Sequence, residues 1–144
     1  MIENYKGSCK FLLQTKNPGR FFTFIERLRP IYEKIILGTT IETDGPKLGS
    51  APSTRVRWNW MVRLKKMGFK TFLSHEPLAD FDPAVLKNWI ETIEPEAVEI
   101  GLENYTNYQT APPEEKILSL IEWLKKKEIP FVLKENLKHL RARM

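Results

Sequence analysis

Five short apolar runs recur along the chain, and each is followed by a small group of polar residues and then by a helical pattern. The runs predict β-strands at residues 10–14, 34–37, 70–73, 97–100 and 130–133. Strands that alternate with helices predict a parallel sheet joined by right-handed crossovers. The expected fold class is therefore α/β, with five parallel strands. An open parallel sheet and part of a TIM-type (β/α) barrel both satisfy this pattern.

Capping residues and apolar spacing mark the helices between the strands. Asn17-Pro18 and Asp82-Pro83 each place a capping residue before a proline, which is typical of a helix start. The spacing predicts four buried helix faces, formed by Phe21, Phe24, Ile25 and Leu28; by Val56, Trp60, Met61 and Leu64; by Val85, Leu86, Trp89, Ile90 and Ile93; and by Ile117, Leu118, Leu120, Ile121 and Leu124. A short basic helix is expected to end the chain.

Residues 43–53 are rich in turn-forming residues and show no period, so we expect a long loop there, acting as a lid or lacking order. The 144 residues are enough for one domain spanning 1–144. No apolar stretch approaches the length of a membrane helix, which is about 18 residues, and the first residues do not resemble a secretory signal. We therefore expect a cytoplasmic protein that does not enter a membrane.

The single cysteine, Cys9, excludes an internal disulfide and cannot alone hold a structural zinc or an iron–sulfur cluster. The net charge of +5 comes from 23 Lys and Arg against 18 Asp and Glu. This excess permits a nucleic-acid or phosphorylated partner without requiring one, because many of the cations fall late in predicted helices and offset the helix dipole. Arg55, Arg57, Trp58 and Arg63, on one predicted helix, are candidates for a polar or a nucleic-acid surface.

The polar groups that follow the strands predict a ligand site. In parallel α/β folds the carboxyl ends of the strands meet at one edge of the sheet, where ligands bind. A carboxylate there can hold an amine or a hydroxyl, and small hydroxyl side chains suit a ribose or a carboxylate. Mutual Lys–Glu pairing and turn capping are the structural alternatives. The candidate ligand-binding residues are Thr15, Lys16, Thr40, Glu42, Ser74, Glu76, Glu103, Asn104 and Lys134.

His75 is the only histidine near these positions. Strand alternation is expected to point its side chain away from Ser74 and Glu76. His139, the other histidine, belongs to a distant helix, so no metal site is expected. A catalytic role for His75 is the less favoured interpretation, and no catalytic residue is assigned.

The turn after the first strand, Thr15-Lys16-Asn17-Pro18-Gly19, lacks a glycine-rich phosphate loop, which argues against a dinucleotide or P-loop domain. The strand ends nevertheless form a recurring set of motifs: Leu13-Gln14-Thr15-Lys16-Asn17-Pro18, Gly38-Thr39-Thr40-Ile41-Glu42, Ser74-His75-Glu76-Pro77-Leu78, Gly101-Leu102-Glu103-Asn104 and Val132-Leu133-Lys134-Glu135-Asn136. In order and spacing this set resembles the later part of radical S-adenosylmethionine barrels, and most of all a poorly characterised, phage-associated group of them.

The resemblance implies a partial or full (β/α) barrel and S-adenosylmethionine as the ligand. Such families bind a [4Fe–4S] cluster through a CxxxCxxC loop, which this chain lacks, and Cys9 lies at the opposite end of its strand. Two explanations follow: the cluster comes from a preceding segment or a separate polypeptide, or the chain has lost the chemistry and kept the pocket. Enzyme activity therefore depends on a missing segment or partner.

An unclosed parallel sheet leaves backbone groups unpaired at its edges, so we also expect self-association or a partner chain. The rival hypothesis is a non-catalytic interaction module, or a nucleic-acid-binding module that uses the basic helices.

Overall fold

The computed structural model of the chain describes residues 2, 4–45, 49–103 and 111–144. The five strands form one all-parallel sheet in the order β1-β2-β3-β4-β5. The strands are β1 (Phe11–Gln14), β2 (Ile35–Thr40), β3 (Lys70–His75), β4 (Ala97–Ile100) and β5 (Phe131–Leu133). The α/β class and the five parallel strands predicted from the sequence are confirmed.

Helices connect the strands as predicted, except after β1. The regular helices are α2 (Thr54–Lys66), α3 (Pro83–Ile93) and α4 (Glu114–Lys126). Between β1 and β2 the chain forms three short pieces, η1 (Pro18–Phe24), α1 (Ile25–Leu28) and η2 (Arg29–Lys34), and the chain ends in η3 (Glu135–Arg143). The proline at the start of η2 has no N–H to continue the α-helical hydrogen bonding, which explains why one helix does not span this connection.

Two of the helix starts are fixed by side-chain caps. The Ser53 hydroxyl accepts a hydrogen bond from the backbone N–H of Val56 at the start of α2. The Asp82 carboxylate accepts from the N–H groups of Ala84 and Val85 at the start of α3. Both caps satisfy backbone donors that have no partner within the helix. They position the two helix starts beside the carboxyl ends of β2 and β3.

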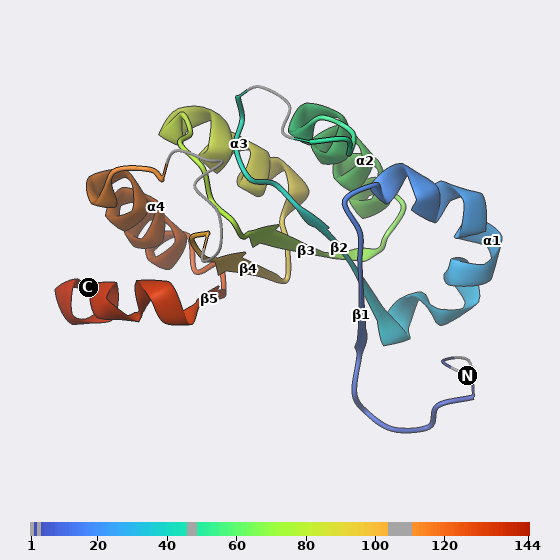
Figure 1. The fold of residues 1–144 in the computed structure, drawn as a ribbon. Coiled ribbons are helices and arrows are strands. Elements are labelled where there is room, and N and C mark those ends of the chain that lie inside the picture. The colour runs from blue at the N-terminus through green and yellow to red at the C-terminus, as the bar shows by residue number, and fades with distance from the viewer. Residues whose placement is uncertain (1, 3, 46–48, 104–110) are drawn as a thin grey trace.

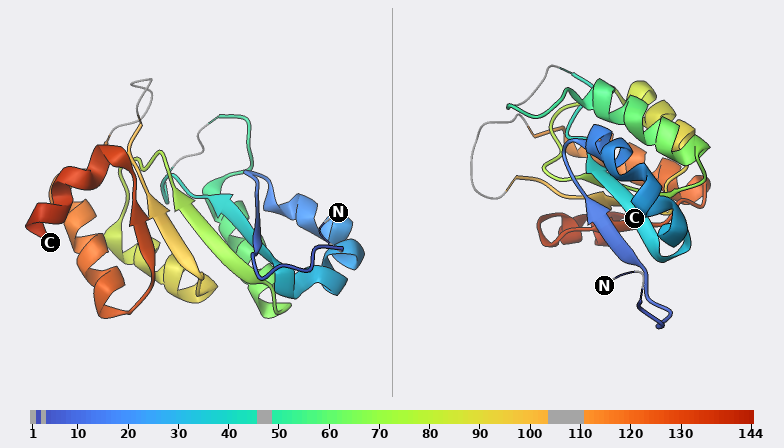
Figure 2. Two further views of the ribbon diagram at one scale, coloured as in Figure 1. Left: turned by 90° about the horizontal axis from the view of Figure 1, so that it is seen from below. Right: turned by 90° about the vertical axis from the view of Figure 1, so that its right-hand side faces the viewer.

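Helices α2, α3 and α4 lie on the same face of the sheet, and the view from below looks directly onto the strands with these helices behind them (Figures 1 and 2). The strand order explains this arrangement, because each right-handed crossover leads to the next strand on the same side. In a doubly wound sheet the strand order reverses and helices cover both faces. The chain is thus wound in one direction, as in a partial (β/α) barrel.

The two faces of the sheet differ in burial. The helix-covered face carries the core, with Leu37, Leu73 and Val98 fully buried between strands and helices. On the opposite face, which we call the open face, Leu12 is 45% exposed and Val132 is 53% exposed. These two residues lie on β1 and β5, the edge strands of the sheet. The open face is therefore accessible at its edge strands, whereas Thr40 and Ser74 nearer its centre are only 5% and 2% exposed.

Some details differ from the sequence-based expectation. Val56 and Phe24, both predicted to be buried, are 43% and 42% exposed. Val56 belongs to the side of α2 that points away from the sheet, because the buried positions of this helix are Thr54, Arg57, Met61 and Leu64. Strands β2 and β3 also extend further than predicted, to Thr40 and His75. Four polar residues expected in loops, Thr39, Thr40, Ser74 and His75, are thus part of the sheet.

Glu128, just after α4, has a φ of 56°, in the left-handed region that disfavours residues with a Cβ atom. We expect Glu128→Gly to raise the free energy of unfolding by about 0.5–1 kcal/mol, since relief of the strain exceeds the entropy that glycine adds to the unfolded chain. Glu122→Gly inside α4 is the control and should lower it by about 1 kcal/mol. Urea unfolding measures both, and a less stable Glu128→Gly protein would contradict the expectation.

Candidate functional site

Polar side chains from all five strand ends form a row across the open face at its carboxyl end. Gln14 Nε2 lies 3.3 Å from Thr40 Oγ1, and Thr40 is the register partner of Ser74 on β3. Ser74 donates to Glu99 Oε1 at 3.1 Å, and Glu99 Oε2 lies 3.0 Å from Lys134 Nζ, just beyond β5. We call Gln14, Thr40, Ser74, Glu99 and Lys134 the polar row. It extends over the whole width of the sheet.

Glu76 joins the row at Lys134, with its Oε2 3.2 Å from Lys134 Nζ. A Cβ atom at Gly101, the first residue after β4, would lie 2.8 Å from Lys134 Cγ and 3.0 Å from Glu76 Oε1. Glycine at this position therefore allows the two side chains to meet. Hydrogen bonds from Lys134 to Glu99 and then to Glu76 raise the pKa of its ammonium group. Two carboxylates share this one ammonium, so the group carries one net negative charge.

A second ionic group lies at the carboxyl end of β2. Glu42 is 2% exposed, and its carboxylate contacts Arg57 Nη1 at 2.8 Å and Lys16 Nζ at 2.7 Å. Arg57 is fully buried and also donates to the carbonyl oxygens of Thr40 and Pro52, at 2.5 Å and 2.8 Å. Because Thr40 precedes the predicted loop 43–53 and Pro52 lies near the end of that loop, one guanidinium holds both sides of the loop. Residues 46–48 lie outside the described residues.

His75 is excluded from the open face, as strand alternation predicted. Its side chain is fully buried on the helix-covered face, and its Nδ1 lies 2.6 Å from the carbonyl oxygen of Ile41. A carbonyl only accepts, so Nδ1 carries the proton, and Nε2 has no partner among the described residues. Burial lowers the pKa of His75 to about 4, which keeps the ring neutral at physiological pH.

Three predicted ligand-binding residues remain. Two of them, Thr15 and Glu103, lie outside the polar row, and the third is Asn104. The Thr15 hydroxyl accepts from the N–H of Asn17 at 3.1 Å, and the Thr15 carbonyl accepts from Thr39, so Thr15 shapes the turn after β1. Glu103 is half-buried beyond β4, and the neighbouring Leu102 is held by two hydrogen bonds to the Asn136 amide. The predicted residue Asn104 lies outside the described residues.

Three residues of the polar row and of the ionic group around Glu42 were not among the predicted ligand-binding residues. Gln14 and Glu99 lie inside strands, and Arg57 belongs to α2. A carboxylate between Val98 and Ile100 interrupts an otherwise apolar strand, and this was the available signal that one face of the sheet is not covered. For Arg57 the sequence gives no such signal, because a buried arginine and an exposed one look alike in a basic helix.

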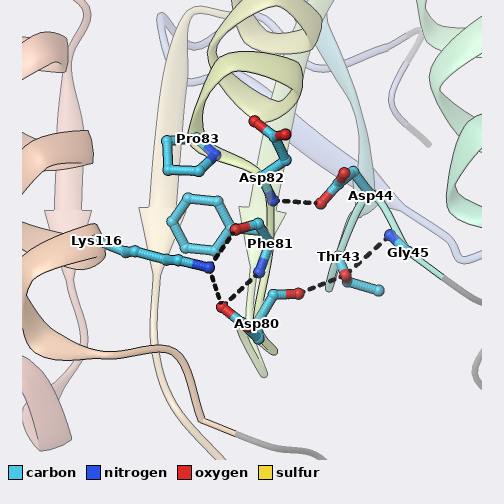
Figure 3. A pocket seen from close by; sticks show the side chains of 8 residues that line it. All are labelled: Thr43, Asp44, Gly45, Asp80, Phe81, Asp82, Pro83 and Lys116. Atoms are coloured by element: carbon cyan, nitrogen blue, oxygen red, sulfur yellow. Dashed lines mark hydrogen bonds and ion pairs between the residues drawn. The ribbon is translucent and has the colours of Figure 1, made fainter.

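A pocket of about 520 Å³ lies beside this edge, between the segments that follow β2 and β3 (Figure 3). Lys116, from α4, contacts Asp80 Oδ1 at 2.7 Å and the Phe81 carbonyl at 2.9 Å, and this contact lowers the pKa of Asp80. Asp44 accepts from the N–H of Asp82, whose own carboxylate caps α3. The carboxylates of the pocket are thus already hydrogen-bonded within the protein.

Comparison of the chain with models of known families, with curated proteins and with solved structures finds no match. In the part of the chain that the structure describes, no three His, Cys, Asp or Glu side chains are grouped so as to hold a metal ion. The described helices include none that is long and apolar enough to cross a membrane. The site is therefore interpreted from its own geometry.

The buried His75 makes stability depend on pH. Its folded-state pKa of about 4 lies below the ordinary value of 6.5, so the unfolded chain binds the proton more tightly. From this group alone, stability should fall by about 3 kcal/mol between pH 7 and pH 4. Urea unfolding over this pH range checks the expectation by comparing the wild type with His75→Gln, which retains an N–H donor for Ile41 and does not titrate. Parallel pH profiles for the two proteins would show that His75 is not responsible.

Proposed function

We propose that the polar row, together with Glu76, binds a small polar ligand at the carboxyl end of the open face. The supporting observation is that one side chain per strand converges there, on a face that helices do not cover. The net negative charge of Glu76, Glu99 and Lys134 favours an ammonium group or hydroxyl groups on the ligand. Gln14 and Thr40 add groups that hydrogen-bond a hydroxyl or a carboxylate.

Apolar side chains lie next to the row on the same face. A Cβ atom at Gly38 would lie 3.1 Å from Leu12 Cδ1 and 3.2 Å from Phe72 Cδ1, so these two side chains close over the glycine. A ligand with a polar end and a flat apolar portion would match this division of the face. S-adenosylmethionine has an ammonium, a carboxylate, ribose hydroxyls and an adenine ring, and the strand-end motifs resemble those of proteins that bind it. It is therefore the ligand that we propose.

In this proposal the chain supplies binding and orientation. Radical chemistry would require an iron–sulfur cluster, and Cys9 is the only cysteine in the sequence. Cys9 is exposed and precedes β1, at the opposite end of the strand from the polar row. The cysteine ligands would therefore come from another segment or from a separate polypeptide. The residues of this chain would hold the ligand while that partner provides the cluster.

Calorimetric titration with S-adenosylmethionine tests the ligand. Glu76→Gln and Glu99→Gln should each weaken binding by about 10- to 100-fold, the loss expected for a hydrogen bond to a charged group. Glu91→Gln is the matched control, because Glu91 also pairs with a lysine, Lys127, but lies on α3 away from the open face. Its affinity should equal that of the wild type. Absence of wild-type binding, or equal affinities for all three variants, would contradict the proposal.

We further propose that the edges of the sheet pair with a second copy or with a partner chain. Leu12 and Val132 are exposed on the two edge strands, and a parallel sheet that ends there leaves backbone groups unpaired. Sedimentation velocity should then show self-association of the isolated chain at micromolar concentration, and Leu12→Lys or Val132→Lys should reduce it. Val56→Lys, which changes an equally exposed residue on α2, should have no effect. If the wild type is a monomer, self-association is contradicted. The chain that covers the sheet edges would then have to be a different one.

A further inference from the structure

The excess positive charge of the chain is concentrated in one helix. Five of the 23 Lys and Arg residues lie in α2, which contains no Asp or Glu, so the rest of the chain carries 18 Lys and Arg against 18 Asp and Glu. The net charge of +5 is therefore the charge of α2 itself. The expectation that the excess serves mainly to offset helix dipoles does not account for this distribution, since Arg55 and Arg57 lie in the first half of the helix, where a cation is unfavourable.

The structure divides these five cations into two sets. Arg57 is buried against Glu42, and Lys65 pairs with Glu94, with 3.7 Å between Nζ and Oε2. The other three, Arg55, Arg63 and Lys66, are exposed and have no ion pair among the described residues. Their positive charges are therefore not balanced by an acidic side chain in the described part of the protein. They give α2 a positive surface directed away from the sheet.

The three cations share this surface with apolar and aromatic groups. Helical spacing places Arg55, Asn59, Val62 and Lys66 on one stripe and Val56, Trp60 and Arg63 on the next, and we call these seven residues the outer face of α2. All of them except Arg55 line a pocket of about 380 Å³. The Arg63 guanidinium lies over the Trp60 ring at 4.6 Å and over the Phe22 ring of η1 at 4.9 Å.

We propose that the outer face of α2 binds single-stranded nucleic acid. Unpaired cations beside an aromatic ring suit a phosphate backbone whose bases stack on indole and guanidinium groups. Arg55 and Arg63 are separated by about 12 Å along the helix axis, at 1.5 Å per residue, so an extended strand lying along α2 would meet both. The surface provides no carboxylate to repel the phosphates.

A single strand fits this surface better than a duplex does. Trp58 of α2 stacks on Trp89 of α3 at 5.5 Å, and the Trp60 ring packs against the Phe22 ring of η1, with 4.9 Å between ring centroids. Because α2 is flanked on both sides (Figure 1), it does not project as a helix must to enter a major groove. Arg57 and Trp58, which the sequence had suggested for this surface, point into the protein and do not contribute to it.

Fluorescence anisotropy with labelled oligo(dT) and oligo(U) of about 12 nucleotides tests the proposal. Three phosphate contacts predict a slope of about −2 in a plot of log affinity against log salt, or a loss of about 15-fold between 50 and 200 mM salt. The variant with Arg55→Gln, Arg63→Gln and Lys66→Gln should bind neither probe. The control carries Lys6→Gln, Lys126→Gln and Arg141→Gln, which remove the same charge from other exposed positions, and should keep most of the affinity.

Each alternative outcome has a definite meaning. Equal losses in the two triple variants would show that binding follows net charge, and would overturn the assignment to α2. Poly-glutamate that competes as well as the oligonucleotides would identify an acidic protein as the better partner and would also overturn it. So would absence of binding of both probes at 50 mM salt. A difference between the DNA and RNA probes would support the proposal and identify the preferred strand. Circular dichroism of both variants confirms that each is folded.

Discussion

The position of the polar row depends on the order of the strands and on the side of the sheet at which the helices cross over. Parallel strands that follow one another in chain order, with the helices crossing over on the same side, leave one face of the sheet without cover. The main apolar core then lies on the other face, where Leu37, Leu73 and Val98 meet the helices. In the polar row on the open face, Gln14 is exposed and Glu99 and Lys134 are half-buried, while Thr40 and Ser74 between them are buried. The alternation of side chains along each strand therefore places the polar row and the main apolar core on opposite faces of the sheet.

Strand β3 shows this separation most clearly. Ser74 belongs to the polar row, while His75, the next residue, is buried in the core with a strongly lowered pKa. The carbonyl oxygen of Ser74 accepts from the N–H of Ile41, and the ring of His75 contacts the carbonyl of that same residue. The core contact thus fixes the end of β2 from one side. Thr40 and Ser74 of the polar row are thus held in place in part by His75, whose side chain does not reach the open face.

The sequence was sufficient to predict the strands, the order of the elements and the edge of the sheet at which polar residues gather. Apolar periodicity depends on local spacing, and the crossover rule turns that spacing into a topology. The pairing of the polar residues could not be predicted, because it depends on register and on contacts between distant segments. Lys134 meets Glu76 only because Gly101 leaves room for both. Glu99 was not among the predicted site residues because Val98-Glu99-Ile100 was assigned to the strand itself, and the candidates were taken from the polar residues that follow each strand.

Arg57 illustrates the same limit for a single side chain. Its position in a basic helix suggested an exposed cation, yet its guanidinium is buried and bonded to Glu42, Thr40 and Pro52. The three acceptors come from segments that only the folded chain brings together. Removal of Glu42 would leave a buried charge without its carboxylate, which costs about 3–5 kcal/mol in comparable cases.

The same contacts determine how freely the chain can vary at this edge of the sheet. Since Arg57 donates to the carbonyl oxygens of Thr40 and Pro52, the end of β2 is tied to the start of α2 by contacts that do not involve the exposed residues Gly49 and Ser50. Loop-closure entropy rises only slowly with length. Gly49 and Ser50 are thus a place where related chains can differ in length, or where a peptide can be inserted, without moving the polar row. Sequence divergence can accumulate here at little structural cost.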